Sequence, residues 1–284
     1  MAKPTVEEFW RSFLEGTDPD LLKLRRLMHR LPSAPRCKMC AAPFARPGSI
    51  LVRPFGFKRW AANSALCSIC ARGLDKEVGG VEVEATFLFA DIRDSTAIAE
   101  RTSPGDFHAM LERFYVAAAK AVDVSGGLVD KYIGDGVVAL YVPAFTIEVA
   151  PALAAVRAGQ ALLEAIGSSP RGKASLPVGV GVHSGPAFVG VMGTEGGVLD
   201  FTGVGDTVNI AARLGSVAAA GELLVSEVSA RQAGIDTAGL ERRRLELKGR
   251  EERVEVVVLG ASAMPIAGGT APEPPAVPPV ERVA

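Results

Sequence analysis

Five polar side chains in the middle of the chain have types that suit metal binding and phosphoryl chemistry: Asp91, Lys131, Asp135, Asn209 and Arg213. Paired carboxylates suit Mg²⁺ or Mn²⁺, which prefer oxygen ligands and keep positions open for phosphate and water. An arginine stays charged and binds phosphate oxygens in pairs through its planar fork. These residue types indicate phosphoryl chemistry, provided that the fold brings them together.

The two carboxylates are expected to meet at one edge of a sheet. Residues 81–89 begin with polar and apolar alternation and end apolar, as a strand entering a core does, and Asp91 follows them directly. Asp135 belongs to an Asp-Gly pair between the apolar runs 128–133 and 137–142, which is a strong hairpin signal. If these strands are neighbours, the carboxylates converge. The alternative is local: Asp91 would cap the next helix, and Asp135 would serve only its turn.

The other three groups come from the hairpin and from a helix. Asn209 and Arg213 are four residues apart in the predicted helix 206–217, so they share a face. Lys131 lies four residues before Asp135, on the strand that leads into the turn. Each has an ordinary alternative, since a lysine on a hairpin is commonly just solvated and Arg213 could pair with a surface acid.

Three motifs at these positions together resemble the catalytic domain of class III nucleotide cyclases, the adenylate and guanylate cyclase family. They are Phe89-Ala90-Asp91-Ile92, Lys131-Tyr132-Ile133-Gly134-Asp135-Gly136, and Asp206-Thr207-Val208-Asn209 followed by Arg213. Residues 182–185 with 189–193 resemble the central hairpin of that family, and residues 247–250 resemble its C-terminal turn. The resemblance covers residues 81–260. It implies an α+β, ferredoxin-like fold with a βαββαβ core and an extra hairpin.

The resemblance also implies a metal site and two catalytic residues. Asp91, Asp135 and the backbone carbonyl of Ile92 would hold two Mg²⁺ or Mn²⁺ ions. Asn209 would hold the ribose, and Arg213 would stabilise charge on the pentavalent α-phosphate.

Three further residues would bind the substrate. The family reads the purine edge at Lys131, where lysine is typical of adenylate cyclases, because an ammonium can donate to adenine N1. Many adenylate cyclases carry an aspartate where this chain has Thr202, although a bacterial subgroup also has threonine. A hydroxyl both donates and accepts, so Thr202 leaves the choice of base open. Lys248 is the residue that we expect at the triphosphate, in preference to Arg250.

The implied reaction is in-line attack of the ribose 3′-hydroxyl of ATP on the α-phosphate, which gives 3′,5′-cyclic AMP and pyrophosphate. The family forms its site between two catalytic domains, so a chain with both halves is expected to work as a homodimer with shared sites. Two alternatives stay open. The substrate could be GTP or a pyrimidine triphosphate, or the protein could be a catalytically silent module that binds a nucleotide or a partner.

The cysteines predict a second metal site. Cys37 and Cys40 form one CxxC pair, Cys67 and Cys70 form another, and 26 residues separate the pairs. Four cysteines in two such pairs match a closed tetrahedral Zn²⁺ site. Iron bound by four thiolates and a redox disulfide pair are the alternatives.

The loop between the cysteine pairs is both basic and aromatic: Arg53, Phe55, Phe57, Lys58, Arg59 and Trp60. Such residues can stack on nucleic acid. We instead expect them to form the small core and rim of the zinc module, so nucleic acid is not an expected partner. A protein partner docking on this module remains open.

Bulk composition limits the class of protein. The chain has 284 residues, 48% of them hydrophobic, and a formal net charge of −1. It can therefore bury a core, and its charge gives no general reason to expect nucleic acid or an acidic membrane. Residues 1–8 are too acidic for a signal peptide, and no apolar run is long enough to span a bilayer. These features predict a soluble, cytoplasmic protein.

Composition divides the chain into N-terminal helices (1–31), a cysteine module and linker (32–80), a cyclase domain (81–260) and a disordered, Ala- and Pro-rich tail (261–284). Thr5 with Glu8 forms a capping box, and Asp18 before Pro19 is a second helix start. Further predicted elements are a helix from Ser103, a helix over 148–166 and two strands around residues 183–185.

Overall fold

The protein was analysed as a computed structural model, which describes residues 5–61, 63–74, 78–146, 149–167, 175–193, 199–246 and 253–261. The predicted tail, Lys248 and the motif at 247–250 lie outside these residues. Within the described ranges, no helix is both long enough and apolar enough to cross a membrane.

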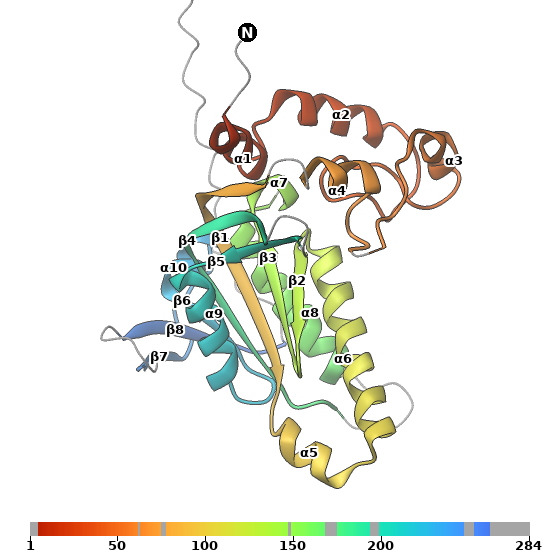
Figure 1. Cartoon of the computed structure of the whole chain (residues 1–284). Helices are drawn as coiled ribbons and strands as arrows, with labels where there is room; N and C mark the ends of the chain where they lie inside the picture. The colour runs from red at the N-terminus through yellow and green to blue at the C-terminus, as the bar shows by residue number, and fades with distance from the viewer. Residues whose placement is uncertain are drawn as a thin grey trace, which may run out of the picture.

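One mixed sheet forms the centre of the molecule (Figure 1). Its strands are β1 (Gly79–Ile92), β2 (Leu128–Ile133), β3 (Gly136–Tyr141), β4 (Val178–Gly193), β5 (Leu199–Val204), β6 (Leu223–Ser226), β7 (Arg242–Leu245) and β8 (Val254–Leu259). The order is β2-β3-β1-β4-β6-β8-β7, with β5 paired to β4. The pairings β2–β3, β3–β1 and β1–β4 are antiparallel, as a ferredoxin-like βαββαβ core requires. The predicted α+β fold is confirmed.

Helices cover both faces of this sheet. They are α5 (Ser95–Arg101), α6 (Pro104–Val124), α7 (Pro143–Thr146), α8 (Pro151–Gly167), α9 (Asp206–Val217) and α10 (Glu227–Gln232). Side chains alternate across β1: Leu88 and Ala90 pack with α6 and α8, whereas Phe87 packs in the cluster that includes α9. The long β1 therefore belongs to two cores, which fixes the position of Asp91 at its end.

The N-terminal segment packs against the same sheet. It contains α1 (Val6–Leu14), α2 (Pro19–His29), α3 (Gly48–Val52), a 3-10 turn η1 (Arg53–Phe55) and α4 (Ser68–Leu74). The predicted capping box of Thr5 and Glu8 is present, with contacts of 2.8 and 3.2 Å, and Asp18 caps α2. Trp10 is fully buried and stacks on Phe201 of β5 with ring centroids 5.9 Å apart. The segment thus shares one apolar cluster with the sheet.

One expectation about the sheet is wrong. Residues 178–193 form a single strand, β4, and not two strands around residues 183–185. Gly185 pairs with Ala85 within an unbroken ladder from Val178 to Val191. A glycine often marks a turn, but here a long partner strand supplies backbone hydrogen bonds on both sides of it.

Candidate active site and cysteine cluster

The hairpin turn brings the two predicted carboxylates together. Antiparallel pairing of β1 with β3 sets Asp91 opposite Gly136, and the backbone N–H of Ile92 donates to the carbonyl oxygen of Asp135 at 3.2 Å. Gly134 has a φ of 57°, the left-handed conformation that a tight turn needs. The hydroxyl of Tyr115 on α6 donates to the carbonyl oxygen of Gly134, so α6 braces the turn.

The charge environment of Asp91 suits a bound cation. Burial raises the pKa of Asp91 to about 6; the nearby Arg93 opposes this rise and Asp135 adds to it. One oxygen, Oδ2, lies 2.6 Å from the Arg93 guanidinium. The other, Oδ1, is buried and has no hydrogen-bond partner among the described residues. A bare carboxylate oxygen beside a second carboxylate fits a divalent metal ion.

Asp91 does not cap the helix that follows β1, which was the alternative explanation for this residue. The helix after β1 is α5, and its N-cap residue is Asp94, which makes no side-chain capping hydrogen bond. Asp91 lies three residues earlier and pairs with Arg93, which also donates to the carbonyl oxygen of Ser216 at the end of α9. Sequence reasoning missed Arg93. Its only signal was its position two residues beyond Asp91.

Lys131 of β2 and Thr202 of β5 lie in contact, before the turn that carries Asp135. Thr202 lies on β5 opposite Gly190, and β5 reaches across to β2 (Figure 1). The Lys131 ammonium donates to the Thr202 hydroxyl at 3.1 Å and lies 3.6 Å from the Asp200 carboxylate. Two residues that are 71 positions apart in sequence therefore form one polar site.

Asp130 belongs to the same site and was not identified from the sequence. The Thr202 hydroxyl donates to its Oδ2 at 2.8 Å, and only 2% of its side chain is exposed. Burial raises the pKa of Asp130 to about 6, although the Thr202 hydrogen bond and Lys131 act in the opposite direction. No local pattern in the sequence signals its role, because its position depends on a register shift in β2 and on its contact with β5.

Helix α9 presents the predicted ribose and phosphate residues. Asn209 is exposed and Arg213 is half-buried. The Thr207 hydroxyl donates to the carbonyl oxygen of Pro186 at 2.6 Å, which anchors the first turn of the helix to β4. Within the described ranges neither Asn209 nor Arg213 has a side-chain hydrogen bond or ion pair, so the structure gives no surface acid as the partner of Arg213.

The four cysteines form a compact, buried cluster. Their sulfur atoms all lie within 4.8 Å of one another, and no disulfide joins them. Cys40 Sγ and Cys67 Sγ are 3.7 Å apart. A tetrahedron with Zn–S bonds of about 2.3 Å has sulfur atoms about 3.8 Å apart, so the cluster has the size of a four-thiolate metal site.

Backbone geometry holds these sulfur atoms in place. The N–H of Cys67 donates to Cys37 Sγ at 3.3 Å, and the N–H of Cys70 donates to Cys67 Sγ at 3.5 Å. Contacts with the other three thiols raise the pKa of Cys70. The four thiols therefore cannot all be ionised together without a cation. The arrangement therefore fits a metal ion better than a reactive dithiol.

The basic and aromatic loop is partly folded inward. Phe57 packs against the apolar cluster, and the Arg59 guanidinium lies over the Phe44 ring at 5.0 Å. Phe55 is 74% exposed. Phe57 therefore belongs to the core of this segment, whereas Phe55 lies on its exposed surface.

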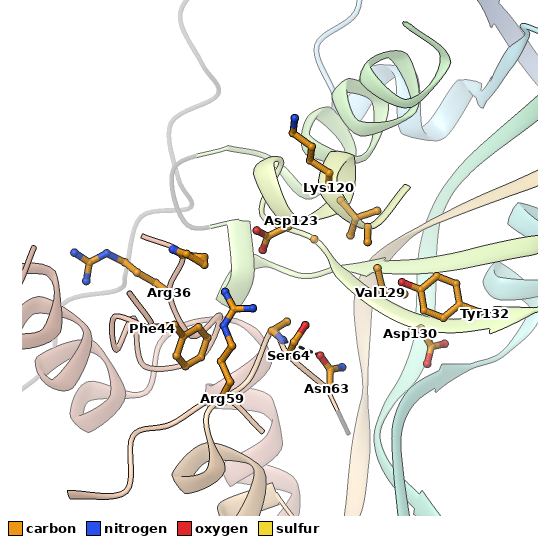
Figure 2. A pocket seen from close by; sticks show the side chains of 15 residues that line it. Arg36, Phe44, Arg59, Asn63, Ser64, Lys120, Asp123, Val129, Asp130 and Tyr132 are labelled. Carbon is orange, nitrogen blue, oxygen red and sulfur yellow. Dashed lines mark hydrogen bonds between the residues drawn. The ribbon is translucent and has the colours of Figure 1, made fainter. Parts of the chain in front are cut away.

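A cavity of about 500 Å³ lies between the cysteine segment and the outer edge of the sheet (Figure 2). Arg36 and Arg59 line it from one side, and Lys120, Asp123 and Asp130 from the other. The two parts of the chain also meet directly, since Lys38 forms an ion pair of 2.9 Å with Asp123.

Residues 81–260 match the family model described as the adenylate and guanylate cyclase catalytic domain. The match spans more than half of the chain, and the protein belongs to this family. Named relatives include an adenylate cyclase of Anabaena cylindrica, 34% identical over 166 residues, which cover 56% of this chain and 32% of that protein. An adenylate cyclase of Mycobacterium tuberculosis is 33% identical over 168 residues, which cover 59% of this chain and 37% of that protein.

Solved cyclases share the fold. The guanylyl cyclase Cya2 matches with a TM-score of 0.58 and 26% identity, covering 63% of this chain and 93% of that structure. The adenylyl cyclase CyaB from P. aeruginosa matches with a TM-score of 0.57 and 25% identity, covering 66% of this chain and 98% of that structure. The matched region spans only about a third of the Anabaena and Mycobacterium proteins.

Proposed function

We propose that this protein is an adenylate cyclase that converts ATP to 3′,5′-cyclic AMP and pyrophosphate. The observation that carries the proposal is the proximity of Asp91 and Asp135 at the end of β1, in a chain that also joins Lys131 to Thr202. One pair suits a divalent metal, and the other suits the edge of a purine. Relatives named adenylate cyclase support ATP as the nucleotide.

Each group would have a distinct task. Asp91, Asp135 and the carbonyl of Ile92 would hold Mg²⁺ or Mn²⁺, which when bound activates the ribose 3′-hydroxyl and neutralises charge on the pyrophosphate. Asn209 would fix the ribose so that this hydroxyl lies in line with the α-phosphate. Arg213, free of other partners among the described residues, would donate to the α-phosphate oxygens as charge builds up. Lys248, outside those residues, stays the proposed contact to the triphosphate.

The proposed active form is a homodimer with shared sites, and the exposure of these groups supports it. Asn209 points away from the core of its own chain, and apolar side chains near both ends of α9 are uncovered. Val204 is 46% exposed before the helix and Val217 is 53% exposed at its end. A second copy placed here would cover apolar surface and bring its own acidic pair to Asn209 and Arg213.

Product formation tests the reaction. Purified protein would be incubated with Mn²⁺ or Mg²⁺ and, separately, ATP, GTP, CTP and UTP. Cyclic AMP from ATP is the expected product, and the absence of any cyclic nucleotide would favour the silent nucleotide-binding module. GTP is the second candidate substrate, because the hydroxyl of Thr202 can in principle pair with either purine and the similar Cya2 is a guanylyl cyclase.

Mixing two inactive variants tests the shared site. Asp91→Ala and Arg213→Ala chains each lack a different half, so a mixed dimer has one intact site. Random mixing should restore about a quarter of wild-type activity. The matched control mixes Asp91→Ala with Asp135→Ala, which damage the same half and should restore nothing. A mixed dimer that forms without recovering activity contradicts the shared site.

We further infer that the cysteine cluster binds one structural Zn²⁺ ion and that the segment around it is a candidate surface for a protein partner. Exposed Ile50, Leu51 and Phe55 lie in α3 and η1 of this segment. One zinc per chain, measured by native mass spectrometry or elemental analysis, is the expected result. Bound iron or a disulfide would replace this assignment.

A further inference from the structure

The position of Asp130 results from an irregularity in β2. Pairing with β3 runs from Val129 opposite Ala139 to Lys131 opposite Val138, so Asp130 is an extra residue with no partner across the ladder. In a regular strand, neighbouring side chains point to opposite faces. A bulge redirects the extra side chain, and here both Asp130 and Lys131 reach the hydroxyl of Thr202.

The contacts of Thr202 define the direction of its hydroxyl proton. Its oxygen lies 2.8 Å from Asp130 Oδ2 and 3.4 Å from the carbonyl oxygen of Gly203. A carboxylate accepts only, and hydrogen bonds to a charged acceptor are the stronger ones. The proton therefore points to Asp130. The Lys131 ammonium donates to the same oxygen at 3.1 Å and occupies one lone pair.

One lone pair of the Thr202 oxygen is left for a ligand. A group that contacts it must be a donor, which describes the 6-amino group of adenine and not the 6-oxo group of guanine. Threonine alone would be neutral between these bases, because its hydroxyl can turn. Because this hydroxyl donates its proton to Asp130, it cannot rotate to donate to the 6-oxo group of guanine.

We propose that Asp130 is a specificity-determining residue that acts through Thr202: it keeps this hydroxyl as a pure acceptor and so selects adenine over guanine. The proposal rests on the cyclase function proposed above and deepens it. Asp130 is a positioning residue, since its side chain is only 2% exposed and it would act through its hydrogen bond with Thr202.

Asp200 provides a matched control. Its carboxylate lies 3.6 Å from the same Lys131 ammonium, but it is 54% exposed and has no hydrogen bond to Thr202. Removing either acid takes one negative charge from beside Lys131. Only removal of Asp130 frees the Thr202 proton, so comparison of the two variants separates hydrogen-bond direction from charge.

The test measures kcat/KM for ATP and GTP in the wild type, Asp130→Ala and Asp200→Ala. It also measures dissociation constants for 3′-deoxy-ATP and 3′-deoxy-GTP, which bind without cyclising. Asp130→Ala should lower the preference for adenine about tenfold in both readouts, the value of one hydrogen bond. Asp200→Ala should change the ratio less than about twofold. An unchanged ratio in Asp130→Ala, or an equal loss in Asp200→Ala, overturns the proposal.

A double-mutant cycle shows whether Asp130 acts through the hydroxyl. In a Thr202→Val background the shape is kept and the hydroxyl is absent, so Asp130→Ala should cause no further loss of preference. An additive loss contradicts the mechanism. If Asp130→Ala does not fold, Asp130→Asn replaces it: its amide can donate to Thr202 as well as accept, and it should weaken the preference in the same direction. An unchanged ratio of ATP to GTP preference in Asp130→Asn would also contradict the proposal.

The two proposals fail in different ways. A wild-type protein that binds the 3′-deoxy nucleotides but forms no cyclic product would contradict the cyclase function, while the binding ratios would still test Asp130. A protein that forms cyclic AMP with a ratio insensitive to Asp130 would keep the cyclase function and remove only this inference.

Discussion

The cysteine cluster and the acidic pair at the end of β1 both suit a metal ion, yet the chain builds them in different ways. The cluster brings together four buried cysteine side chains from residues 37–70, and each sulfur is close to the other three. The acidic pair offers two carboxylates, and one oxygen of Asp91 has no partner among the described residues. A site with all four ligands from protein is closed and structural, whereas an incomplete site leaves room for substrate. Mutation of the cysteine cluster is therefore expected to lower stability, whereas mutation of the acidic pair is expected to lower activity.

Removal of a cysteine ligand is expected to have the largest effect. Cys40→Ser should abolish zinc binding and cost on the order of 5 to 10 kcal/mol of the free energy of unfolding, since metal binding and folding of such a site are coupled. Zinc content and thermal unfolding measure this. Met39→Leu, a buried change of similar volume next to the ligand, should keep the metal and cost less than about 1.5 kcal/mol. A Cys40→Ser variant that lacks zinc but keeps full stability would contradict a structural role for the metal.

Removal of the Asp91 carboxylate should lower activity without lowering stability. Asp91→Ala is expected to lower metal-dependent turnover by about a thousandfold or more, since it would remove a proposed ligand of the ions that would activate the attacking hydroxyl. Its unfolding temperature should not fall, because burial raises the pKa of this carboxylate and its charge therefore opposes folding at neutral pH. Asp94→Asn, at the neighbouring N-cap, is the control and should stay active. Retained turnover in Asp91→Ala would remove it from the metal site.

Trp10 lies where the N-terminal segment packs against β5. Trp10→Ala should lower the free energy of unfolding by about 3 kcal/mol, because it empties a fully buried site against Phe201. Since Phe201 precedes Thr202 on β5, KM for ATP should also rise a few-fold. Trp10→Phe keeps an aromatic ring and should have a smaller effect on both. A loss of stability with an unchanged KM would show that the N-terminal segment supports the fold without affecting nucleotide binding.

The smallest effect concerns pH and Asp130. Its folded pKa is about 6, above the unfolded value of about 3.9, so the folded state binds this proton more tightly. The stability contributed by the proton is fully present below pH 4 and lost as pH rises through 6. Compared with Asp130→Asn, the wild type should gain about 2 kcal/mol between pH 7 and pH 4.5. Among the described residues, the charged groups that act on Asp130 are Lys131 and Asp200. A pH-independent difference would contradict the raised pKa.

Local signals explain why much of the fold was predictable. The Asp135-Gly136 pair placed a hairpin between β2 and β3, and Asp206 to Val217 forms a helix as expected. The two CxxC pairs predicted a cluster that the structure contains. Each of these features depends on a few neighbouring residues, through turn conformation, helical periodicity or ligand spacing.

Features that depend on distant strands were not predictable in this way. The single strand β4 needed β1 as a partner, and the bond from Thr202 to Asp130 needed β5 to lie across a bulge in β2. Arg93 gained its role only when α9 packed beside it. Sequence alone determined which chemical groups the protein has and which short elements carry them. The tertiary structure decided which groups share a proton or a charge, because those contacts join residues that only the folded sheet brings within hydrogen-bonding distance.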